Sequence, residues 1–419
     1  MSLPSTPGRS RLGPLIFLAN RGYRGTWIAG GIVSGVRWLE VLAASVFVFQ
    51  LTASPFSVSL VMLARLAPNM LLGGLIGTAT SFVSRERLMA IGFIGLGVTR
   101  LVLAVLVLFG IIEVWQVMLG MFISGIIDAS EFPVRRSLAG DYVGPEEAHR
   151  ALTFDQFSNV FTMATGPVAG GYLLDWIGLH GAYFVGAALN VVGTYIALTL
   201  PPPPNVRLPA RAPVLSTLVE GWRYIRSQRI LVGAMVLTLI FNTFTWPFTT
   251  MIPVVGREEL GLSAGLIGVL MAMLGVGSFI ANLTLSLIRR QVVAPAYFLG
   301  VLIGTVGVLL FSMTTTFEAA LIVMLLTGIG VGGFSSNQGA VVFINSAPQY
   351  RAQTMGLLTM AIGIAPLGIL HIGILSAWIG APLAMAVCAI EGLIAIAISF
   401  FIWPELRGRP QAPPGPGAA

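Results

Sequence analysis

The chain has 419 residues, of which 56% are hydrophobic and only 9% are charged, and its mean hydropathy is +0.90. This composition leaves too few polar residues to cover a surface in water, so an ordinary soluble domain is excluded. The net charge of +7 comes from arginines between apolar segments and offers no basic groove for a nucleic acid. We therefore expect a membrane protein that contacts the lipid bilayer and binds no nucleic acid.

Twelve long apolar segments predict twelve membrane-spanning helices, because a bilayer core requires about 20 apolar residues per helix. In the first half, the spans are expected at residues 27–50, 56–79, 88–112, 115–134, 152–176 and 182–200. In the second half, they are expected at residues 230–255, 262–288, 294–313, 319–344, 353–378 and 382–403. The predicted fold class is an all-α membrane protein.

The positions of the arginines indicate the orientation, since cytoplasmic loops retain positive charge. All 23 basic residues are arginines, and all but Arg37, Arg65, Arg100 and Arg257 lie in the termini or in every second loop. Both termini are therefore predicted to be cytoplasmic. The first 26 residues lack the pattern of a cleavable signal, and the lysine-free composition suggests a GC-rich bacterial gene. We expect a multi-pass protein of the bacterial inner membrane.

The longest connection divides the chain into two halves of six spans each. It begins with four prolines at 201–204, which cannot continue a helix. Residues 215–226 suit a short amphipathic helix on the cytoplasmic surface, and a plain linker is the alternative. The predicted parts are a cytoplasmic tail, a first bundle, a cytoplasmic linker, a second bundle and a disordered cytoplasmic tail, at residues 1–26, 27–200, 201–229, 230–403 and 404–419.

The two halves resemble each other weakly, as expected of a duplicated transporter. Gly166-Pro167 in the fifth span corresponds to Ala365-Pro366 in the eleventh. Two six-helix bundles around a central cavity are the expected architecture.

Several motifs resemble the major facilitator superfamily, and more closely its branch of macrolide-efflux and enterobactin-exporter-like proteins. They are LTASP at 51–55, ARLAP at 64–68, Gly77 with RERL at 85–88, and Pro348 with Arg351. The sharpest is the segment with Gly166, Pro167, Gly170 and Gly171, which is similar to the GPxxGG element of the superfamily's antiporters. The resemblance covers nearly the whole chain and implies an antiporter of drugs and protons. We expect a monomer.

By the same resemblance, Gly77, Arg85 and Arg87 belong to a cytoplasmic gate loop. The superfamily usually carries an Asp-Arg pair where this chain has Ser81-Phe82. Its fourth-span arginine has no evident counterpart either, so proton coupling must depend on other residues.

Two acids in the fourth span are the first candidates for that role. A charge at the centre of a bilayer costs about 3 kcal/mol or more unless it is paired or faces water. Asp128 and Glu131 share a helix face, and we expect Glu131 to pair with Arg135 one turn later. Asp128 lies deeper and is the leading candidate to load and release a proton. The alternative is that Asp128 only bonds an arginine or a helix end.

The first and fifth spans also carry polar residues. Arg37 and Glu40 are three residues apart, with Ser34 one turn earlier, and are expected to neutralise one another. They form either a cavity-lining pair that substrate or proton breaks, or a permanent salt bridge. Asp155 near the cytoplasmic end of the fifth span is either a gate acid or a helix-start residue, and the second is expected.

Polar stripes in the seventh and tenth spans are candidates for the substrate cavity. The seventh span carries Asn242, Thr245, Trp246 and Thr249 on one face, and the tenth carries Ser335, Asn337 and Gln338. The resemblance implies that spans one, four, seven and ten line the cavity. Hydrogen bonding between helices is the alternative for any single residue.

The remaining candidates are few. His371 is a secondary proton candidate, Glu391 is expected to stand alone facing lipid, and Cys388 is expected to be a packing residue. The histidines and the single cysteine are expected to form no metal site, and the glycine clusters within apolar spans are expected to be packing sites. A nucleotide-binding P-loop needs a lysine, which the chain lacks, so we expect neither nucleotide nor cofactor.

These observations predict a secondary active transporter, not an enzyme, that exports small amphipathic molecules, such as drugs or siderophore-like metabolites, in exchange for protons. Proton-coupled import is one alternative. A transport-inactive assembly or sensor protein with the same fold is the other.

Overall fold

The computed structural model describes residues 17–79, 84–203, 214–286 and 293–407. All regular structure in these residues is helical. The first half contains α1 (Arg21–Thr52), α2 (Pro55–Ala79), α3 (Arg85–Leu108), α4 (Val114–Val143) and α5 (Pro145–Leu198). The second half contains α6 (Val214–Ser227), α7 (Arg229–Ile240), η2 (Phe241–Thr245), η3 (Trp246–Thr250), α8 (Ile252–Glu258), α9 (Ala264–Ser286), α10 (Val293–Phe311), α11 (Phe317–Asn345), η5 (Pro348–Tyr350), α12 (Arg351–Ile362), α13 (Ala365–Ile379), α14 (Ala381–Ile402) and η6 (Pro404–Arg407).

These helices provide twelve spans. Within the described residues, ten helical segments are long and apolar enough to cross a membrane. One of the ten lies in α5, whose backbone leaves the helical conformation at Gly178, with φ of 69°. The positive φ suits glycine, and the bend turns α5 into two antiparallel spans. The 25-residue α2 supplies the twelfth span. The predicted all-α fold with twelve spans is confirmed.

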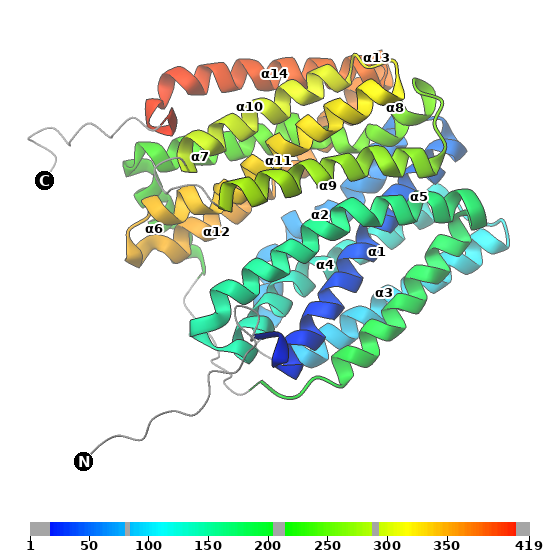
Figure 1. Ribbon diagram of the computed structural model, residues 1–419, viewed down its shortest axis with the longest axis horizontal. Helices are drawn as coiled ribbons and strands as arrows, with labels where there is room; N and C mark the ends of the chain where they lie inside the picture. Colours follow the sequence, from blue (N-terminus) through cyan, green and yellow to red (C-terminus); the bar gives the residue numbers. More distant parts are fainter. Residues whose placement is uncertain (1–16, 80–83, 204–213, 287–292, 408–419) are drawn as a thin grey trace, which may run out of the picture.

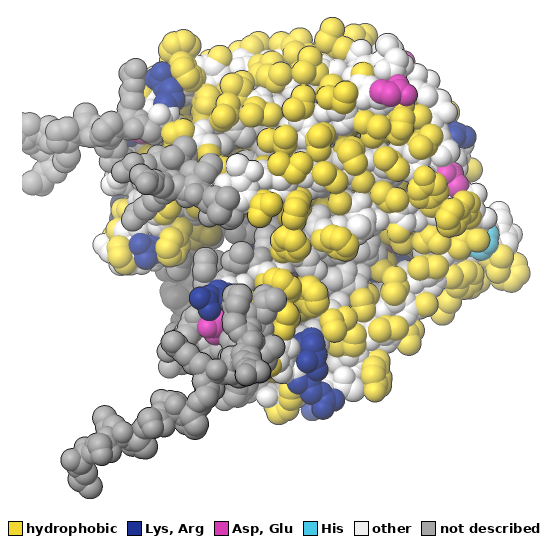
Figure 2. All heavy atoms as spheres, viewed as in Figure 1, with side chains coloured by type: hydrophobic (Ala, Val, Ile, Leu, Met, Phe, Trp, Pro, Cys, Tyr) yellow, Lys and Arg dark blue, Asp and Glu magenta, His cyan; other side chains and the backbone are white. Residues whose placement is uncertain are grey.

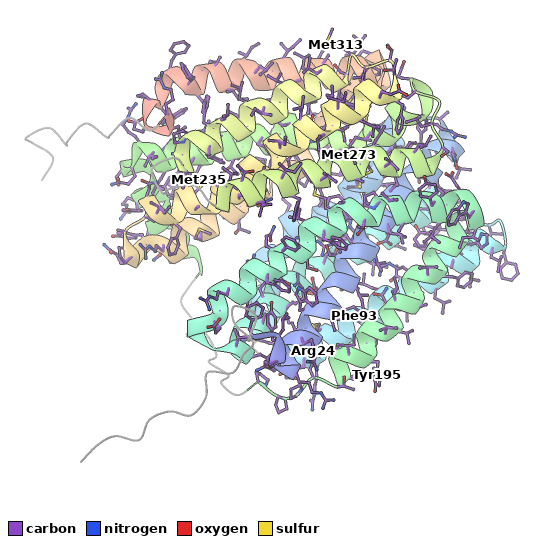
Figure 3. All side chains as sticks on the ribbon, in the orientation of Figure 1. Arg24, Phe93, Tyr195, Met235, Met273 and Met313 are labelled. Carbon is purple, nitrogen blue, oxygen red and sulfur yellow. The ribbon has the colours of Figure 1, made fainter. Side chains whose placement is uncertain are left out.

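The spans form two bundles, α1–α5 and α7–α14 (Figure 1). The start of α1 and the end of α14 lie toward the same end of the molecule, and the bundles diverge toward that end. They come together at the opposite end, where α5 lies beside α9. The face seen in Figure 2 is largely apolar, with charged side chains gathered toward its edges. Phe93 is buried inside the first bundle, whereas Tyr195 and Met313 lie exposed on the outside (Figure 3).

The seventh span is broken in its middle. A π-helical turn at Phe241–Thr245 is followed by a 3-10 turn at Trp246–Thr250 before α8 continues the span. Pro247 explains the break, because proline has no backbone N–H and its ring clashes with the carbonyl four residues earlier in a regular helix. The break redirects the side chains of η3 relative to those of η2.

Glycines allow the helices of the second bundle to pack backbone against backbone. A methyl group added at Gly328 of α11 would lie 2.3 Å from the carbonyl oxygen of Leu274 in α9. At Gly330 it would lie 2.2 Å from the backbone nitrogen of Gly304 in α10. The prediction that this cluster serves packing is confirmed.

Gly328→Ala should therefore lower the thermal unfolding temperature of the purified protein. The methyl group has no room, and forcing atoms into a packed helix contact costs about 1–3 kcal/mol. Gly356→Ala in α12 is the matched control, because nothing lies within 4 Å of the added methyl group. Equal unfolding temperatures for the two variants would contradict this account of the glycine cluster.

Candidate functional site

A cavity of about 180 Å³ lies between the two bundles. The first bundle contributes Arg37, Trp38, Val41 and Ser45 of α1 and Met62, Arg65 and Leu66 of α2. The second bundle contributes Trp246 and Thr249 of η3, Pro253 of α8 and Met271 of α9. Most of these described lining residues are apolar or aromatic, and the two charged ones among them are arginines. Ligand sites commonly combine an apolar lining with a few placed polar groups.

Behind the cavity wall, Glu40 of α1 holds two arginines from neighbouring helices. Its Oε2 accepts hydrogen bonds from Arg100 of α3 at 2.8 Å and from Arg65 of α2 at 3.0 Å. Glu40 and Arg100 are each 1% exposed, so both charges are removed from water. Without their partners, these buried ions would be strongly unfavourable in an apolar bundle. The contact therefore fastens α1 to α2 and α3.

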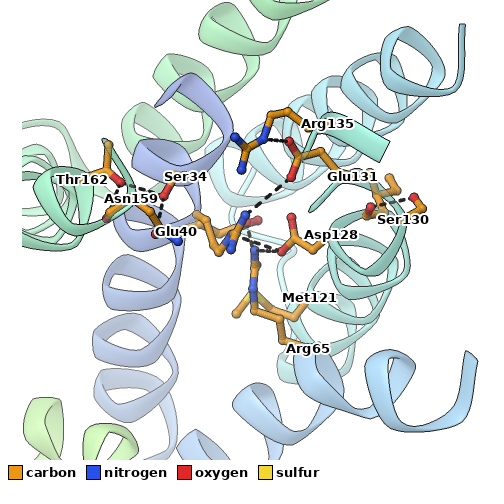
Figure 4. Close-up of polar contacts among 12 residues, drawn as sticks. Ser34, Glu40, Arg65, Met121, Asp128, Ser130, Glu131, Arg135, Asn159 and Thr162 are labelled. Carbon is orange, nitrogen blue, oxygen red and sulfur yellow. Dashed lines mark hydrogen bonds and ion pairs between the residues drawn. The ribbon is translucent and has the colours of Figure 1, made fainter. Parts of the chain in front are cut away.

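Asp128 of α4 continues the ion network from the other side of Arg65 (Figure 4). Its Oδ2 accepts a hydrogen bond of 2.5 Å from Arg65 Nη2 and lies 3.6 Å from Arg37 Nε. Arg37 in turn lies 3.9 Å from Glu131 Oε2. Asp128 Oδ1 is buried, and no described residue forms a hydrogen bond with it.

Arg135 completes the network. Its Nε donates to Glu131 Oε1 at 2.6 Å, as predicted for this pair, and its Nη1 contacts Asp155 of α5. Asp155 was expected to be a helix-start residue, but it is a buried ion-pair partner instead. The eight residues alternate in charge across α1–α5, in the order Arg100, Glu40, Arg65, Asp128, Arg37, Glu131, Arg135, Asp155. We call them the ion chain.

The predicted pair of Arg37 with Glu40 is wrong. The two side chains leave α1 in different directions, so Glu40 meets arginines of α2 and α3 while Arg37 meets acids of α4. Spacing along one helix cannot show which neighbouring helix each side chain faces. Arg65 and Arg100 were not predicted as site residues. The signal was present, since both arginines lie in apolar spans and outside the pattern of charged loops.

Ser34, proposed as a cavity residue, instead joins α1 to α5. Its hydroxyl lies 2.7 Å from Thr162 Oγ1 and donates to Asn159 Oδ1 at 3.1 Å. Ser34 is 4% exposed, and it does not line the cavity. Ser34 therefore serves hydrogen bonding between helices, which is the alternative to lining the cavity.

The break in the seventh span divides its predicted polar face. Trp246 and Thr249 line the cavity. Asn242 and Thr245 are buried within the second bundle, where Asn242 donates to the carbonyl of Thr238 and Thr245 contacts Thr305 at 2.7 Å. Asn242 and Thr245 of the π-helical turn therefore stabilise the second bundle, and Trp246 and Thr249 of the 3-10 turn face the space between the bundles.

The tenth-span candidates lie away from the cavity lining. Gln338 of α11 donates to Thr238 of α7 at 3.3 Å, and Asn337 donates to the carbonyl of Gly333. Ser335 is exposed and bonds back to its own helix. In this conformation these three residues hold the second bundle together or face its surface.

His371 and Glu391 meet on the outer side of the second bundle. His371 Nε2 of α13 lies 3.3 Å from Glu391 Oε2 of α14, so the expectation that Glu391 stands alone is wrong. Cys388 is one helical turn earlier, and the three ligand atoms lie within 4.8 Å of one another. The expectation that histidine and cysteine form no cluster is therefore also wrong. The exposed neighbours Leu367 and Ile374 place this cluster toward the outer surface of the second bundle.

The glycines of the fifth span bring three helices together. Methyl groups added at Gly166 and Gly170 would collide with α1, 2.9 Å from the carbonyl oxygen of Gly35 and 2.6 Å from that of Leu39. One added at Gly171 would lie 2.2 Å from the carbonyl oxygen of Ala264 in α9. The element thus packs α5 against α1 on one side and against the second bundle on the other.

Pro167 takes part in the same contact between bundles. A methyl group added at Gly268 of α9 would lie 2.4 Å from the carbonyl oxygen of Pro167. The backbones of α5 and α9 therefore approach each other closely over several turns.

Asp175, which the sequence did not point to, closes this contact. Its carboxylate accepts hydrogen bonds from the backbone N–H groups of Ala264 at 3.1 Å and Gly265 at 2.7 Å. These two groups begin α9, and a carboxylate is favoured at a helix N-terminus because it satisfies free N–H groups and the helix dipole. The first bundle thus caps a helix of the second at the end where the bundles meet.

The proposed gate residues lie at the other end. Arg85 of α3 forms an ion pair with Asp141 of α4, and Arg87 is exposed. Gly77 lies in α2, at a position whose surroundings are not described. Ser81 and Phe82 lie outside the described residues.

Besides forming a cavity between two helical bundles, the chain matches the model of a known protein family over most of its length. The family model of the Major Facilitator Superfamily matches residues 26–367. The chain belongs to the Major Facilitator Superfamily. It is a small-molecule transporter of this superfamily and not an enzyme.

Three superfamily relatives align over most of their lengths. An uncharacterised MFS-type transporter, YfiS of Bacillus subtilis (strain 168), is 23% identical over 84% of this chain and 86% of its own. The staphyloferrin A transporter of Staphylococcus aureus (strain NCTC 8325 / PS 47) is 20% identical over 88% and 93%. The lysophospholipid transporter LplT of Serratia proteamaculans (strain 568) is 26% identical over 75% and 76%. The substrates in these names are those of the relatives.

Solved structures share the superfamily fold. A bacterial homologue of the human lysosomal transporter Spinster, in an inward-facing and occupied conformation, gives a TM-score of 0.72 at 15% identity. The alignment covers 97% of this chain and all of that one. The nucleoside transporter NupG gives 0.69 at 14% identity, over 91% of this chain and 98% of its own.

Glu40→Gln should strongly destabilise the superfamily fold of this chain. Two buried arginines would lose their shared carboxylate, and removing one partner of a buried ion pair costs about 3–5 kcal/mol. Glu147→Gln is the matched control, because Glu147 pairs with Arg150 at 3.4 Å on the surface, where such pairs contribute about 0–1 kcal/mol. Thermal unfolding in detergent measures both. Similar unfolding temperatures for the two variants would rule out a stabilising role of the ion chain.

Proposed function

We propose that this chain is a proton-coupled secondary transporter that moves small amphipathic molecules across the bacterial inner membrane by alternating access. The observation that carries the proposal is the cavity between the bundles, whose wall in the first bundle is backed by the buried ion chain. An apolar lining beside charged groups suits a molecule with an apolar body and a polar head. Both termini are proposed to be cytoplasmic, on the arginine pattern.

The shape of the molecule supports alternating access. The bundles meet where Asp175 caps α9 and diverge toward the end with the termini (Figure 1). With the termini in the cytoplasm, this conformation faces inward. The opposite conformation requires that the contact between α5 and α9 open, which exposes two backbone N–H groups and one carboxylate to water.

Asp128 is the proposed proton site. It is 9% exposed, lies between Arg65 and cavity-lining Arg37, and keeps Oδ1 free of described hydrogen-bond partners. A proton on Oδ1 would weaken the attraction of Asp128 for Arg37, which is already beyond hydrogen-bond distance. Arg37 would then respond to the contents of the cavity. This places proton binding and substrate binding on neighbouring residues, as coupling requires.

Export is the first candidate direction. It is supported by the similarity of the Gly166 to Gly171 segment to the antiporters' GPxxGG element and by the resemblance to exporters of macrolides and enterobactin. The close approach of this segment to both α1 and α9 puts it where the bundles must separate. Its glycines serve a contact that has to form and open in each cycle.

Import together with protons is the second candidate, and one observation favours it. The ion chain contains four arginines and four acids, so its formal charge is zero. A proton on Asp128 leaves one positive charge in a low-dielectric site, and an anion beside Arg37 would cancel it. Proton and anion would then bind together and travel in the same direction.

Asp175→Ala should weaken closure at the end where the bundles meet. Loss of a capping carboxylate costs about 0.5–2 kcal/mol, so the population open to the outside should rise about fivefold. The measurement is labelling of Thr249→Cys in the cavity by a membrane-impermeant maleimide added to whole cells. Glu113→Ala is the control, since Glu113 caps α4 within one bundle. Equal labelling in both variants would contradict the proposed role of Asp175.

Asp128→Asn should abolish proton coupling. In acid-loaded inside-out vesicles with a pH-sensitive dye, a panel of amphipathic compounds is added outside, which is the cytoplasmic face. Proton release from the lumen indicates that protons are exchanged for the compound, as in export. Further acidification of the lumen indicates that the compound and protons move in the same direction. We expect the response to fall at least about tenfold in Asp128→Asn and to persist in Asp141→Asn, whose acid pairs with Arg85 away from the cavity.

A response that is equal in wild type and Asp128→Asn would remove Asp128 from coupling. No response from either, with both proteins folded, would favour the transport-inactive assembly or sensor protein.

A further inference from the structure

The charge that the cavity presents to a ligand has one sign. Of the described residues lining it, the charged ones are Arg37 and Arg65, and none of these lining residues is an acid. The side chain of Arg37 is 25% exposed, whereas those of Glu40, Asp128 and Glu131 are 1%, 9% and 4% exposed. The acids that balance the arginines therefore lie behind the wall. A ligand in the cavity meets a guanidinium group first.

Arg37 is also the least tightly held arginine of the ion chain. Its closest approaches to acids are 3.6 Å and 3.9 Å, compared with 2.5 Å and 3.0 Å for Arg65 and 2.8 Å for Arg100. Its Nε is buried and donates no hydrogen bond to any described residue. Nε is therefore a donor without a described acceptor, and movement of Arg37 toward the cavity would leave Asp128 bonded to Arg65 and Glu131 bonded to Arg135.

The rest of the lining suits an apolar body of modest size. Trp38, Met62 and Leu66 face the cavity from the first bundle, and Trp246 and Met271 face it from the second. Aromatic rings and methionines adapt to flat or flexible apolar groups. A cationic amphiphile would meet like charge at Arg37 and could reach no acid without displacing an arginine.

We propose that the transported molecule is an amphipathic anion, whose carboxylate, sulfonate or phosphate oxygens bind Arg37 and whose apolar part packs between Trp38 and Trp246. A guanidinium group suits this role, because its planar donors match two oxygens of an oxyanion at once. The inference rests on the proposed function, in that it takes the cavity to be the substrate site. The oxyanion belongs to a free small molecule or to the headgroup of a single-chain lipid.

The test is equilibrium binding to the full chain in nanodiscs of phosphatidylcholine, whose zero net charge does not favour either probe. The probes are 1-naphthalenesulfonate and 1-naphthylmethylammonium, which share a ring system and differ in charge. Isothermal titration should show the anion binding at least about tenfold more tightly. Arg37→Gln should weaken the anion about tenfold, Arg37→Lys about threefold, and the surface control Arg150→Gln not at all.

Equal binding of the two probes to wild type, or tighter binding of the cation, would overturn the proposal even if Arg37→Gln fails to fold. Unchanged anion binding in a folded Arg37→Gln variant would overturn it as well. Displacement of the bound naphthalenesulfonate by lysophosphatidylglycerol would support a lipid headgroup as the source, and its retention would support a free anion. Because binding needs no transport cycle, selective anion binding without proton movement would leave this inference standing while the proposed coupling fails.

Discussion

Buried charge must be neutralised inside a membrane protein, and this constraint organises the first bundle. A single arginine or carboxylate in an apolar helix is unfavourable by several kcal/mol, so each must find an opposite partner on another helix. The eight residues of the ion chain meet this requirement by alternating in sign from Arg100 to Asp155. The solution joins α1–α5 into one unit. It also makes the unit sensitive to any added proton or ion, because its formal charge is zero.

The two bundles contribute different chemistry to the cavity. The described buried polar contacts of the second bundle are mainly between uncharged groups, such as Thr238 with Tyr297 and Thr245 with Thr305. Its wall of the cavity is therefore apolar and aromatic, with Trp246 presented by the break at Pro247. The first bundle supplies the cationic edge at Arg37. The two ends of the proposed amphipathic ligand would meet two different bundles, so movement of one bundle against the other would change both contacts together.

The contact between the bundles includes close approaches of backbone groups beside side-chain packing such as that of Phe157 on Phe279. The carbonyl oxygens of Pro167 and Ala264 lie close to glycines of the opposite helix, and Asp175 binds two N–H groups at the start of α9. Smooth helix surfaces can separate without rotamer changes, and water can satisfy the capping groups once they part. The proposed alternation between two conformations would require this contact to open and to form again.

The sequence by itself determined the number of spans, the family and which charges lie within apolar segments, because hydropathy and helix length are local properties. The pairing of Glu131 with Arg135 was also readable, since both lie on one turn of one helix. Only the tertiary structure decided that Glu40 binds Arg100, which is 60 residues away, and that Arg37 turns to α4. It also joined His371 to Glu391 and placed Asp175 on α9. These contacts depend on which helices are neighbours and how each is rotated, and spacing along a single helix carries neither.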